Sequence, residues 1–285
     1  MATGSLEEKK RVHYLDFINF KLPFPTLSEQ QKIAAFLMAV DKRIQQLTKK
    51  KDLLAQYKKG VMQKIFDREV RFKDDKGNDF ADWQEKKFGE IFTFRTTNSY
   101  SRDNLNYEAG EVKNIHYGDI HTKFNSFFDI TKEYVPFINQ EISLKKIAED
   151  NYCKVGDLVI ADASEDYADV GKCIEITNLN NEKVLAGLHT FLARPDLYKM
   201  ASGFSNYLMK SREVRLQIMT IAQGTKVLSI STGRLNKVKL NIPSEPEQQK
   251  IANFLSAIDD KVNLVNQELK KTRTYKKGLL QQMFI

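Results

Sequence analysis

Long hydrophobic runs are absent from this chain of 285 residues. No apolar stretch approaches the roughly 18 to 20 residues that a membrane-spanning helix needs. The first residues, MATGSLEEKK, also lack the apolar core of a secretory signal peptide, and they fit a tag remnant or an abrupt native start equally well. The sequence therefore predicts a cytoplasmic protein without a membrane partner.

Catalytic and cofactor-binding motifs are missing as well. The chain has no G-x-x-x-x-G-K-[ST] loop, no G-x-G-x-x-G and no H-E-x-x-H. Its two cysteines, Cys153 and Cys173, form no C-x-x-C pattern, which favours buried thiols in a reducing compartment over a disulfide or a zinc site. We therefore expect no catalytic residue, no metal and no cofactor bound by this chain.

Two weaker metal patterns do occur. His116 and His121 are five residues apart, a spacing that could hold a metal only if a turn brings them together. An acidic stretch could in principle bind magnesium for phosphodiester chemistry, but it lacks the nearby lysine typical of nucleases; it comprises Asp157, Asp162, Glu165 and Asp166. We expect no metal at the histidine pair, and we interpret the acidic stretch as polar residues of turns and strand ends.

What the chain does contain is positive charge and a repeat. Its net charge of +8 favours an anionic partner, nucleic acid first. Residues 22–66 and 240–284 align without a gap at a constant offset of 218, with 18 of 45 positions identical. The identities are concentrated in EQQKIA near the start and YKKG near the end of each copy. One structural unit therefore occurs twice and flanks everything else.

Each copy has the pattern of a long helix. Apolar residues recur at alternating steps of four and three, which is a heptad seam typical of coiled coils. The seam positions are Ile33, Leu37, Val40, Ile44, Leu47, Leu54, Val61 and Ile65 in the first copy, and Ile251, Leu255, Ile258, Val262, Val265, Leu269, Leu279 and Met283 in the second. Lysine or threonine interrupts each seam twice, at Lys51, Lys58, Thr272 and Lys276. About 40 helical residues would span roughly 60 Å.

The ends and one interior position of each repeat carry further signals. Thr26 and Ser244 precede Glu29 and Glu247 by three residues, the spacing of a capping box. Gly60 and Gly278 recur at the same place inside the two helices, where glycine costs about 1 kcal/mol relative to alanine. This recurrence predicts close contact between the helices at both glycines; the alternative is a loosely formed helix end.

Residues 67–82 are polar and predict a linker, and residues 83–239 differ in composition from the repeats. Short runs of aromatic and β-branched residues, such as 91–94, 114–117, 158–160 and 173–176, alternate with turn residues and predict strands. A helix is predicted at about 203–222, followed by strand-like alternation over 225–243. Residues 12–25 resemble residues 230–243 in character, so the chain would begin with the tail of a unit whose full version comes later.

The order of these segments predicts an α+β protein. It divides into an N-terminal remnant ending in a strand (1–25), a first long helix (26–66), a mixed α/β domain (67–239) and a second long helix (240–285). Because one helix enters the mixed domain and the other leaves it, their seams would pair antiparallel as a coiled coil.

Candidate binding residues lie in the polar and aromatic loops of the mixed domain. Guanidinium, imidazole, hydroxyl and ammonium groups on projecting loops can read base edges and neutralise phosphates. The candidates for DNA binding are Arg95, Tyr100, Arg102, His116, Tyr117, His121, Lys123, Lys172, His189, Thr190, Thr225 and Lys226. Only their number gives them weight, since each alone is compatible with ordinary surface.

The repeat resembles the specificity (S) subunit of type I restriction–modification systems. The shared features are P-x-x-x-EQQKIA-x-FL-x-A-[IV]-D at both repeat starts, YKKG with a following Q-x-x-F at both ends, and Trp83 followed by QEKKFGEIF. The resemblance implies a target-recognition domain that reads duplex DNA and helices that set spacing and dock methyltransferase (M) subunits, with a restriction/translocase (R) subunit in the complex. It also implies that S-adenosylmethionine, ATP and magnesium belong to partner subunits, and that this chain is not an enzyme.

One departure is that the family normally has two recognition domains, and only one is complete here. The resemblance then suggests a homodimer of the half-length chain, about twice 33.0 kDa, that reads a symmetric site. Two other classes stay open: a stand-alone nuclease or methyltransferase with a coiled-coil arm, and an assembly protein whose domain binds no DNA. The seam residues above, with Gly60 and Gly278, are the expected residues for helix contact and partner docking.

Overall fold

The computed structural model describes residues 13–19, 21 and 24–283. The chain divides into two compact units, one comprising Met1–Asp52 with Leu264–Ile285 and the other Leu53–Asn263. Among the described residues, no helix is both long enough and apolar enough to cross a membrane.

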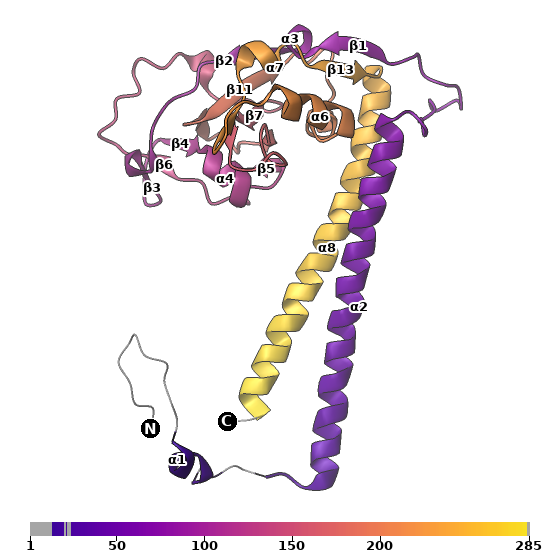
Figure 1. Ribbon diagram of the computed structural model, residues 1–285, viewed down its shortest axis with the longest axis vertical. Helices are drawn as coiled ribbons and strands as arrows, with labels where there is room; N and C mark the ends of the chain where they lie inside the picture. Colours follow the sequence, from indigo (N-terminus) through magenta and orange to yellow (C-terminus); the bar gives the residue numbers. More distant parts are fainter. Residues whose placement is uncertain (1–12, 20, 22–23, 284–285) are drawn as a thin grey trace. The chain divides into compact units, whose positions relative to one another are not determined.

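Two long helices, α2 (Leu27–Phe66) and α8 (Glu245–Met283), confirm the predicted pair. In Figure 1 they lie side by side and run in opposite directions. The seam residues of α2 are buried or half-buried, whereas most residues between them are exposed, and α8 has the same pattern. Burial on a narrow seam explains why the heptad period is visible in the sequence.

Two of the four residues that interrupt the seams form ion pairs with the facing helix. Lys58 bonds Asp259 in the second unit, and Lys276 bonds Asp41 in the first. Both partners differ by the repeat offset of 218, so these are two copies of one ion pair, related by the antiparallel symmetry of the helices. Each of these two lysines therefore lies next to a carboxylate of the facing helix.

The prediction of close helix contact at Gly60 and Gly278 is wrong. A Cβ atom built at either position would meet nothing within 4 Å. The reason is geometric: both residues fall between seam positions, so they point away from the facing helix.

The predicted strand near the N-terminus is contradicted where the structure describes it. Tyr14–Ile18 forms a one-turn helix, α1. The apolar residues of YLDFI satisfy helical spacing as well as a strand pattern, and so short a run does not separate the two. Residues 20, 22 and 23, which would complete the predicted strand, lie outside the described residues.

Between α2 and α8 lies a strand-rich region that we call the head. Its strands are β1 (Gln84–Lys87), β2 (Phe92–Arg95), β3 (Leu105–Asn106), β4 (Val112–Ile115), β5 (Phe127–Asp129), β6 (Phe137–Ile138), β7 (Leu158–Ala161), β8 (Ala163–Ser164), β9 (Cys173–Asn178), β10 (Lys183–Ala186), β11 (Thr190–Pro195), β12 (Leu228–Ser229) and β13 (Lys239–Ile242). Its helices are α3 (Phe88–Ile91), α4 (Tyr117–Thr122), α5 (Phe204–Met209), α6 (Arg212–Ile221) and α7 (Thr232–Leu235), with 3₁₀ turns η1 (Arg102–Asn104) and η2 (Glu149–Asn151).

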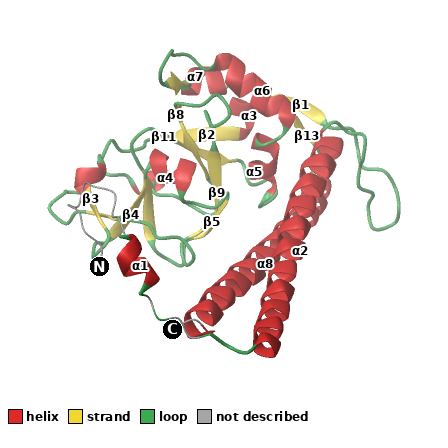
Figure 2. Cartoon of the chain, turned by 60° about the horizontal axis from the view of Figure 1, so that its bottom comes forward, coloured by secondary structure: helices red, strands yellow, loops and turns green. Residues whose placement is uncertain are grey.

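The strands, yellow in Figure 2, form two larger sheets and two short pairs. The five-stranded sheet has the order β2-β11-β7-β9-β5 and is antiparallel except for the β5–β9 pair. The four-stranded sheet has the order β10-β4-β6-β3. β13 closes back on β1, and β12 pairs with β8.

The central strand β7 is buried on both faces. Leu158 and Ile160 join one hydrophobic cluster, whereas Val159 and Ala161 join another. Successive side chains of a strand point to opposite faces, so a strand between two cores reads as one continuous apolar run. This accounts for the run LVIA in the sequence.

The region predicted as one helix over 203–222 forms two. α5 ends at Met209 and α6 begins at Arg212, and Ser211 between them has an extended backbone. All six residues of α5 are buried, so its direction is set by tertiary contacts rather than by continuation of α6. The alternation over 225–243 likewise gives only β12 and β13, with α7 between them.

The head is held on the first turns of α8. The Glu247 carboxylate, fully buried, accepts hydrogen bonds from Trp83 Nε1 at 3.2 Å and from Arg71 at 3.2 and 3.0 Å. Gln248 Oε1 accepts from Ala201 N at 2.9 Å. Ile251, Leu255 and other apolar residues of α8 complete the largest hydrophobic cluster.

A tyrosine connects the head to the seam ion pair in the same unit. Tyr207 Oη donates to Asp259 at 2.7 Å, and Lys58 lies over the Tyr207 ring, 5.1 Å from its centroid. Burial and the adjacent Asp259 carboxylate raise the pKa of Tyr207, so the phenol keeps its proton. Head, α2 and α8 therefore meet at one polar contact inside Leu53–Asn263.

Candidate nucleic-acid interface

A cluster of aromatic rings forms where β4 gives way to α4. His116 caps α4, because its Nδ1 accepts from Gly118 N at 3.1 Å. Burial and the nearby Arg102 charge lower the pKa of His116 from 6.5 to about 4. The imidazole is therefore neutral near pH 7 and acts as a hydrogen-bonding group rather than a cation.

Tyr117 lies among three histidines. Its ring centroid is 4.7 Å from His116, 6.1 Å from His121 and 5.2 Å from His189. His121 Nε2 contacts Ala163 O at 2.9 Å, and His189 Nδ1 contacts Asp162 Oδ1 at 3.2 Å. His189 is half-exposed, and its φ of 55° is in the left-handed region that non-glycine residues seldom adopt.

Two cationic candidates converge on one buried carboxylate. The Asp119 carboxylate accepts hydrogen bonds from Nη1 and Nη2 of Arg102 at 2.7 and 2.8 Å. It also forms an ion pair with Lys123 Nζ at 3.0 Å. Burial raises the pKa of Asp119, but the hydrogen bonds from Arg102 and Lys123 outweigh it, and the net pKa lies below its ordinary value. Two positive charges and one negative charge leave a net charge of about +1 here.

Further polar and aromatic groups surround this centre. Lys123 Nζ also donates to Tyr107 Oη at 3.1 Å, and the Tyr107 ring stacks on Tyr134 at 4.4 Å. Tyr134 is 71% exposed. Lys172 Nζ donates to His121 O at 2.9 Å and so reaches the same cluster from β9's leading turn. We call the cluster of Arg102, His116, Tyr117, His121, Lys123, Lys172 and His189 the α4 cluster.

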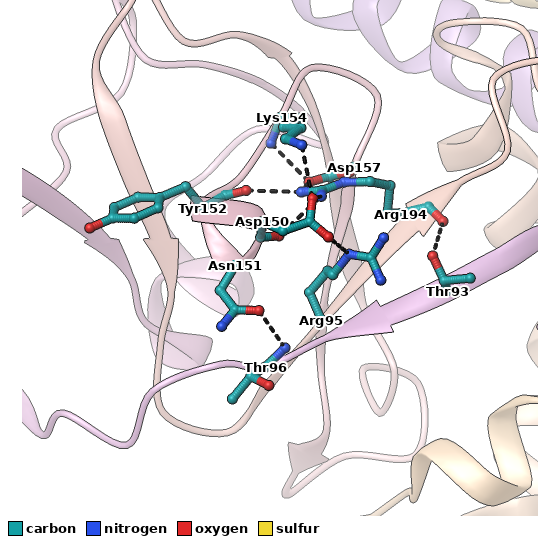
Figure 3. A network of polar contacts seen from close by, with 9 residues as sticks. All are labelled: Thr93, Arg95, Thr96, Asp150, Asn151, Tyr152, Lys154, Asp157 and Arg194. Carbon is teal, nitrogen blue, oxygen red and sulfur yellow. Dashed lines mark hydrogen bonds and ion pairs between the residues drawn. The ribbon is translucent and has the colours of Figure 1, made fainter. Parts of the chain in front are cut away.

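Three of the predicted binding residues, Arg95, Tyr100 and Thr190, lie apart from these contacts or are covered. Arg95 bonds Asp150 at 2.7 Å, in a network that also holds Arg194 and is shown in Figure 3. Tyr100 lies against the small core around Val112. Thr190 is buried, and its hydroxyl donates to Gly187 O at 2.5 Å.

Figure 3 also shows how the Arg95 network is fixed. Arg194 bonds Asp157 through Nε and Nη2 at 2.9 and 2.8 Å and the carbonyl oxygen of Tyr152 at 2.9 Å. Asp150 bonds Arg194, Arg95 and Lys154. Because Arg194 is bonded to two backbone carbonyls and Arg95 and Arg194 both pair with Asp150, this network has the character of a structural support for β2 and β11.

Thr225 and Lys226 are exposed in the turn between α6 and β12. β12 pairs with β8, the strand whose Ala163 carbonyl contacts His121. The turn is therefore connected to the α4 cluster through backbone pairing. Gly224 in this turn has a φ of 129°, and a Cβ there would lie 1.9 Å from Val227 O.

Sequence reasoning missed Asp119, Tyr107 and Tyr134. Asp119 was one of many turn-associated acids, and only its burial beneath Arg102 distinguishes it. Tyr107 and Tyr134 are 27 positions apart, so their stacking has no local signature; two tyrosines in polar loops were the only available signal.

The described part of the chain contains no cluster of side chains arranged as a metal site and no disulfide. There, no group of three or more His, Cys, Asp or Glu side chains is placed to hold a metal ion. The acidic residues considered above separate: Asp157 bonds Arg194, Asp162 contacts His189, and Asp166 caps its own loop at Ala168 N. Cys153 and Cys173 are buried and unlinked, and burial raises the pKa of Cys173 to about 11.

These features describe a mixed α/β head joined to paired repeat helices. Comparison with known families matches residues 7–56 and 81–272 to the type I restriction modification DNA specificity domain. Because the two ranges include most of the chain, the protein belongs to this family. The family resemblance seen in the repeat motifs is thereby confirmed.

Individual relatives agree. The chain is 26% identical over 277 residues to the type I restriction enzyme MjaVIII specificity subunit of Methanocaldococcus jannaschii, over 93% of this chain and 61% of that protein. The S subunit of a type I restriction-modification system from M. genitalium has a similar fold, with a TM-score of 0.56, 15% identity and coverage of 100% of this chain and 68% of that one. A chain from a structure on assembly and conformational transition of the type I R-M system gives a TM-score of 0.55 at 20% identity, over 92% of this chain and 59% of that one.

The chain covers only part of the length of the relatives that it matches. The chain spans about three fifths of the curated relative that it matches. Its described residues contain one head and both long helices.

Proposed function

We propose that this chain is the DNA-recognition component of a type I restriction–modification complex, and that its head reads one half of a bipartite site. The observation that carries the proposal is the α4 cluster, where three imidazoles, a tyrosine and three cationic side chains gather around α4. Family membership and the net charge of +8 support it.

The chemistry of the cluster suits base reading more than charge attraction alone. Neutral imidazole and tyrosine hydroxyl groups can donate to and accept from base edges. Arg102 and Lys123 share Asp119, so we expect them to contribute about one phosphate neutralisation together rather than two. Lys172, bound to a backbone carbonyl, adds another.

The chain itself is proposed to be non-catalytic. Methylation and cleavage would come from M and R subunits, which would hold S-adenosylmethionine, ATP and magnesium. The paired helices supply the docking platform, since their outer faces are rich in exposed lysines such as Lys49, Lys50 and Lys59. Purified chain should leave DNA unchanged with magnesium or S-adenosylmethionine, and turnover that survives rigorous purification would support the stand-alone enzyme.

A bipartite site requires two heads, and the described chain folds one. The second head has to come from elsewhere. A second copy paired through the helices would give a particle of about twice 33.0 kDa, which sedimentation at high protein concentration measures.

The decisive test of the function is reconstitution with a methyltransferase partner. Methylated positions mapped across a genome should share one half-site, and substitution of His189 by alanine should relax or abolish that half-site. If the His189→Ala variant methylates the same positions, the proposal that the α4 cluster recognises bases is contradicted.

A matched pair of lysines tests phosphate contact. Lys172 and Lys199 both bond an aspartate three residues earlier, but Lys199 belongs to the segment that contacts α8. Lys172→Ala should lower DNA affinity and reduce the slope of log K against log[salt] by about 1. Lys199→Ala should change neither, and equal effects of the two would contradict this assignment.

A further inference from the structure

Two tyrosine rings stack face to face beside the α4 cluster. Their centroids are 4.4 Å apart, and their planes differ by 17°. Tyr107 comes from the loop after β3 and Tyr134 from the loop between β5 and β6, so the pair joins two loops of the head. Tyr107 is half-buried, whereas Tyr134 is 71% exposed. One face of the Tyr134 ring therefore lies on Tyr107, and the other is open to solvent.

Both loops are fixed by side chains that bond to backbone. Asn106 Oδ1 accepts hydrogen bonds from the backbone N–H groups of residues 108 and 109 at 2.9 and 3.0 Å. In the second loop, Glu133 Oε1 accepts from N and Nδ2 of Asn125 at 2.9 and 2.8 Å, and Val135 is buried in the core beneath. The orientation of Tyr134 is thus set in advance, so a ligand that binds its open face loses little free energy in ordering the loop.

Lys123 connects the tyrosine stack with the charged side of α4. Its Nζ donates to Tyr107 Oη at 3.1 Å and lies 5.5 Å from the centroid of the Tyr107 ring. The same Nζ is 3.0 Å from Asp119, which also accepts from Arg102. Hydrogen bonds with Tyr107 and Asp119 raise the pKa of Lys123, so its ammonium group stays charged at neutral pH. With a net charge of about +1 beside the stack, the ligand that fits combines a flat ring with negative charge.

We propose that the open face of Tyr134 binds an unpaired nucleobase of DNA by stacking. A nucleobase supplies the flat ring and its phosphate supplies the negative charge, a combination that neither an apolar side chain nor a free anion offers. In an intact duplex both faces of a base are covered by its neighbours, so the ligand is a base from an opened pair. This inference rests on the proposed function, because the head must already lie on DNA for a base to reach Tyr134.

A bound base would extend the tyrosine stack to three rings. Stacking on an aromatic ring is tolerant of base identity, since every base has a π-face. Tyr134 would therefore stabilise an opened base pair without selecting its sequence, and selection would stay with the α4 cluster. Enzymes that modify a base extrude it from the duplex. A head that stabilises opened DNA beside the site it reads would lower the free energy that a methyltransferase partner needs for this step.

Three DNA duplexes of one sequence test the proposal with the full chain: one fully paired, one with a single mismatched pair, and one with a nick. Fluorescence anisotropy measures the affinity for each. The mismatched duplex should bind about tenfold more tightly than the paired one, because its bases unstack more easily. The nicked duplex should not, since it bends readily but keeps every base paired. Tyr134→Ala should abolish the preference for the mismatch, and Tyr134→Phe should retain it. The control Tyr198→Ala, at a tyrosine that is 97% exposed and contacts no ring among the described residues, should also retain it.

Three outcomes would overturn the proposal: equal affinity for mismatched and paired duplexes, a nicked duplex bound as tightly as the mismatched one, or a preference that survives Tyr134→Ala. A second readout uses the unsubstituted chain. With 5-iodouracil at the mismatched position, irradiation should cross-link the DNA to Tyr134, and cross-links at other residues alone would contradict stacking there. Binding of the paired duplex tests the proposed function separately. Its absence would refute that function, whereas normal binding without any preference for the mismatch would refute only the base site on Tyr134.

Discussion

The contact between Glu247 and the head gives a quantitative prediction. Substitution of Glu247 by alanine removes a fully buried carboxylate that accepts three N–H bonds. The buried indole N–H of Trp83 then has no acceptor, which costs on the order of 1–3 kcal/mol. Arg71 loses two bonds but keeps Asp82 and the carbonyl oxygens of Phe80 and Ala81.

The total loss of unfolding free energy depends on how many partners Arg71 keeps once Glu247 is removed. Breaking a fully buried ion pair costs about 3–5 kcal/mol, because the remaining charge has no compensation. The Arg71 side chain is 24% exposed and retains its other partners, so its share is smaller. We expect Glu247→Ala to lower the free energy of unfolding by about 2–4 kcal/mol.

The repeat provides the control. Glu29 occupies the equivalent position on α2, is exposed and bonds no described side chain, so Glu29→Ala should cost less than about 0.5 kcal/mol in the natural chain. Urea unfolding followed by far-UV circular dichroism and by fluorescence measures both, since Trp83 is the only tryptophan. A cost below about 1 kcal/mol for Glu247→Ala, or equal costs for the two variants, would refute this account of head anchoring.

Three further perturbations follow from described contacts. Tyr207→Phe should cost about 1 kcal/mol, and a double-mutant cycle with Asp259→Asn should show coupling between the two; additive effects would remove the hydrogen bond from the account. The pKa of His116 falls from 6.5 to about 4 on folding, so its contribution to stability is complete above about pH 6.5 and is lost as the pH falls toward 4. His116→Asn, which keeps a capping acceptor, should make unfolding less dependent on pH in that range, and an unchanged pH profile would contradict it. Gly60→Ala should stabilise by up to about 1 kcal/mol in thermal unfolding, whereas destabilisation would restore a close helix contact there.

The long helices could be predicted from the sequence because their signal is repeated. A seam that recurs over many turns outweighs any single residue, so Lys51 and Lys58 did not hide it. The wrong prediction at the two glycines also rests on repetition. Recurrence at Gly60 and Gly278 was interpreted as contact, but position relative to the seam, not recurrence, decides what a helical residue faces.

The α4 cluster could be predicted by residue type but not as a group. His116, Tyr117 and His121 are close in the sequence, whereas His189 joins them only because β11 and β7 pair and bring the turn before β11 beside Asp162. Arg95 and Thr190 matched the same chemical criteria and proved to be tied into support contacts. Arg95 and Arg102 each pair with a carboxylate that is distant in the sequence, so residue type alone does not predict their surroundings.

The paired lysines of the helix seam have a consequence for alignment of the two helices. Lys58 meets Asp259 in one unit and Lys276 meets Asp41 in the other. Sliding one helix past the other by a heptad would keep apolar residues opposed, but it would move each lysine about 10 Å from its aspartate and leave the charge within an apolar seam. The two pairs therefore select one register among those that the heptad repeat alone permits. An insertion or deletion in only one helix would disturb at least one of them, so we expect the lengths of α2 and α8 to be constrained together.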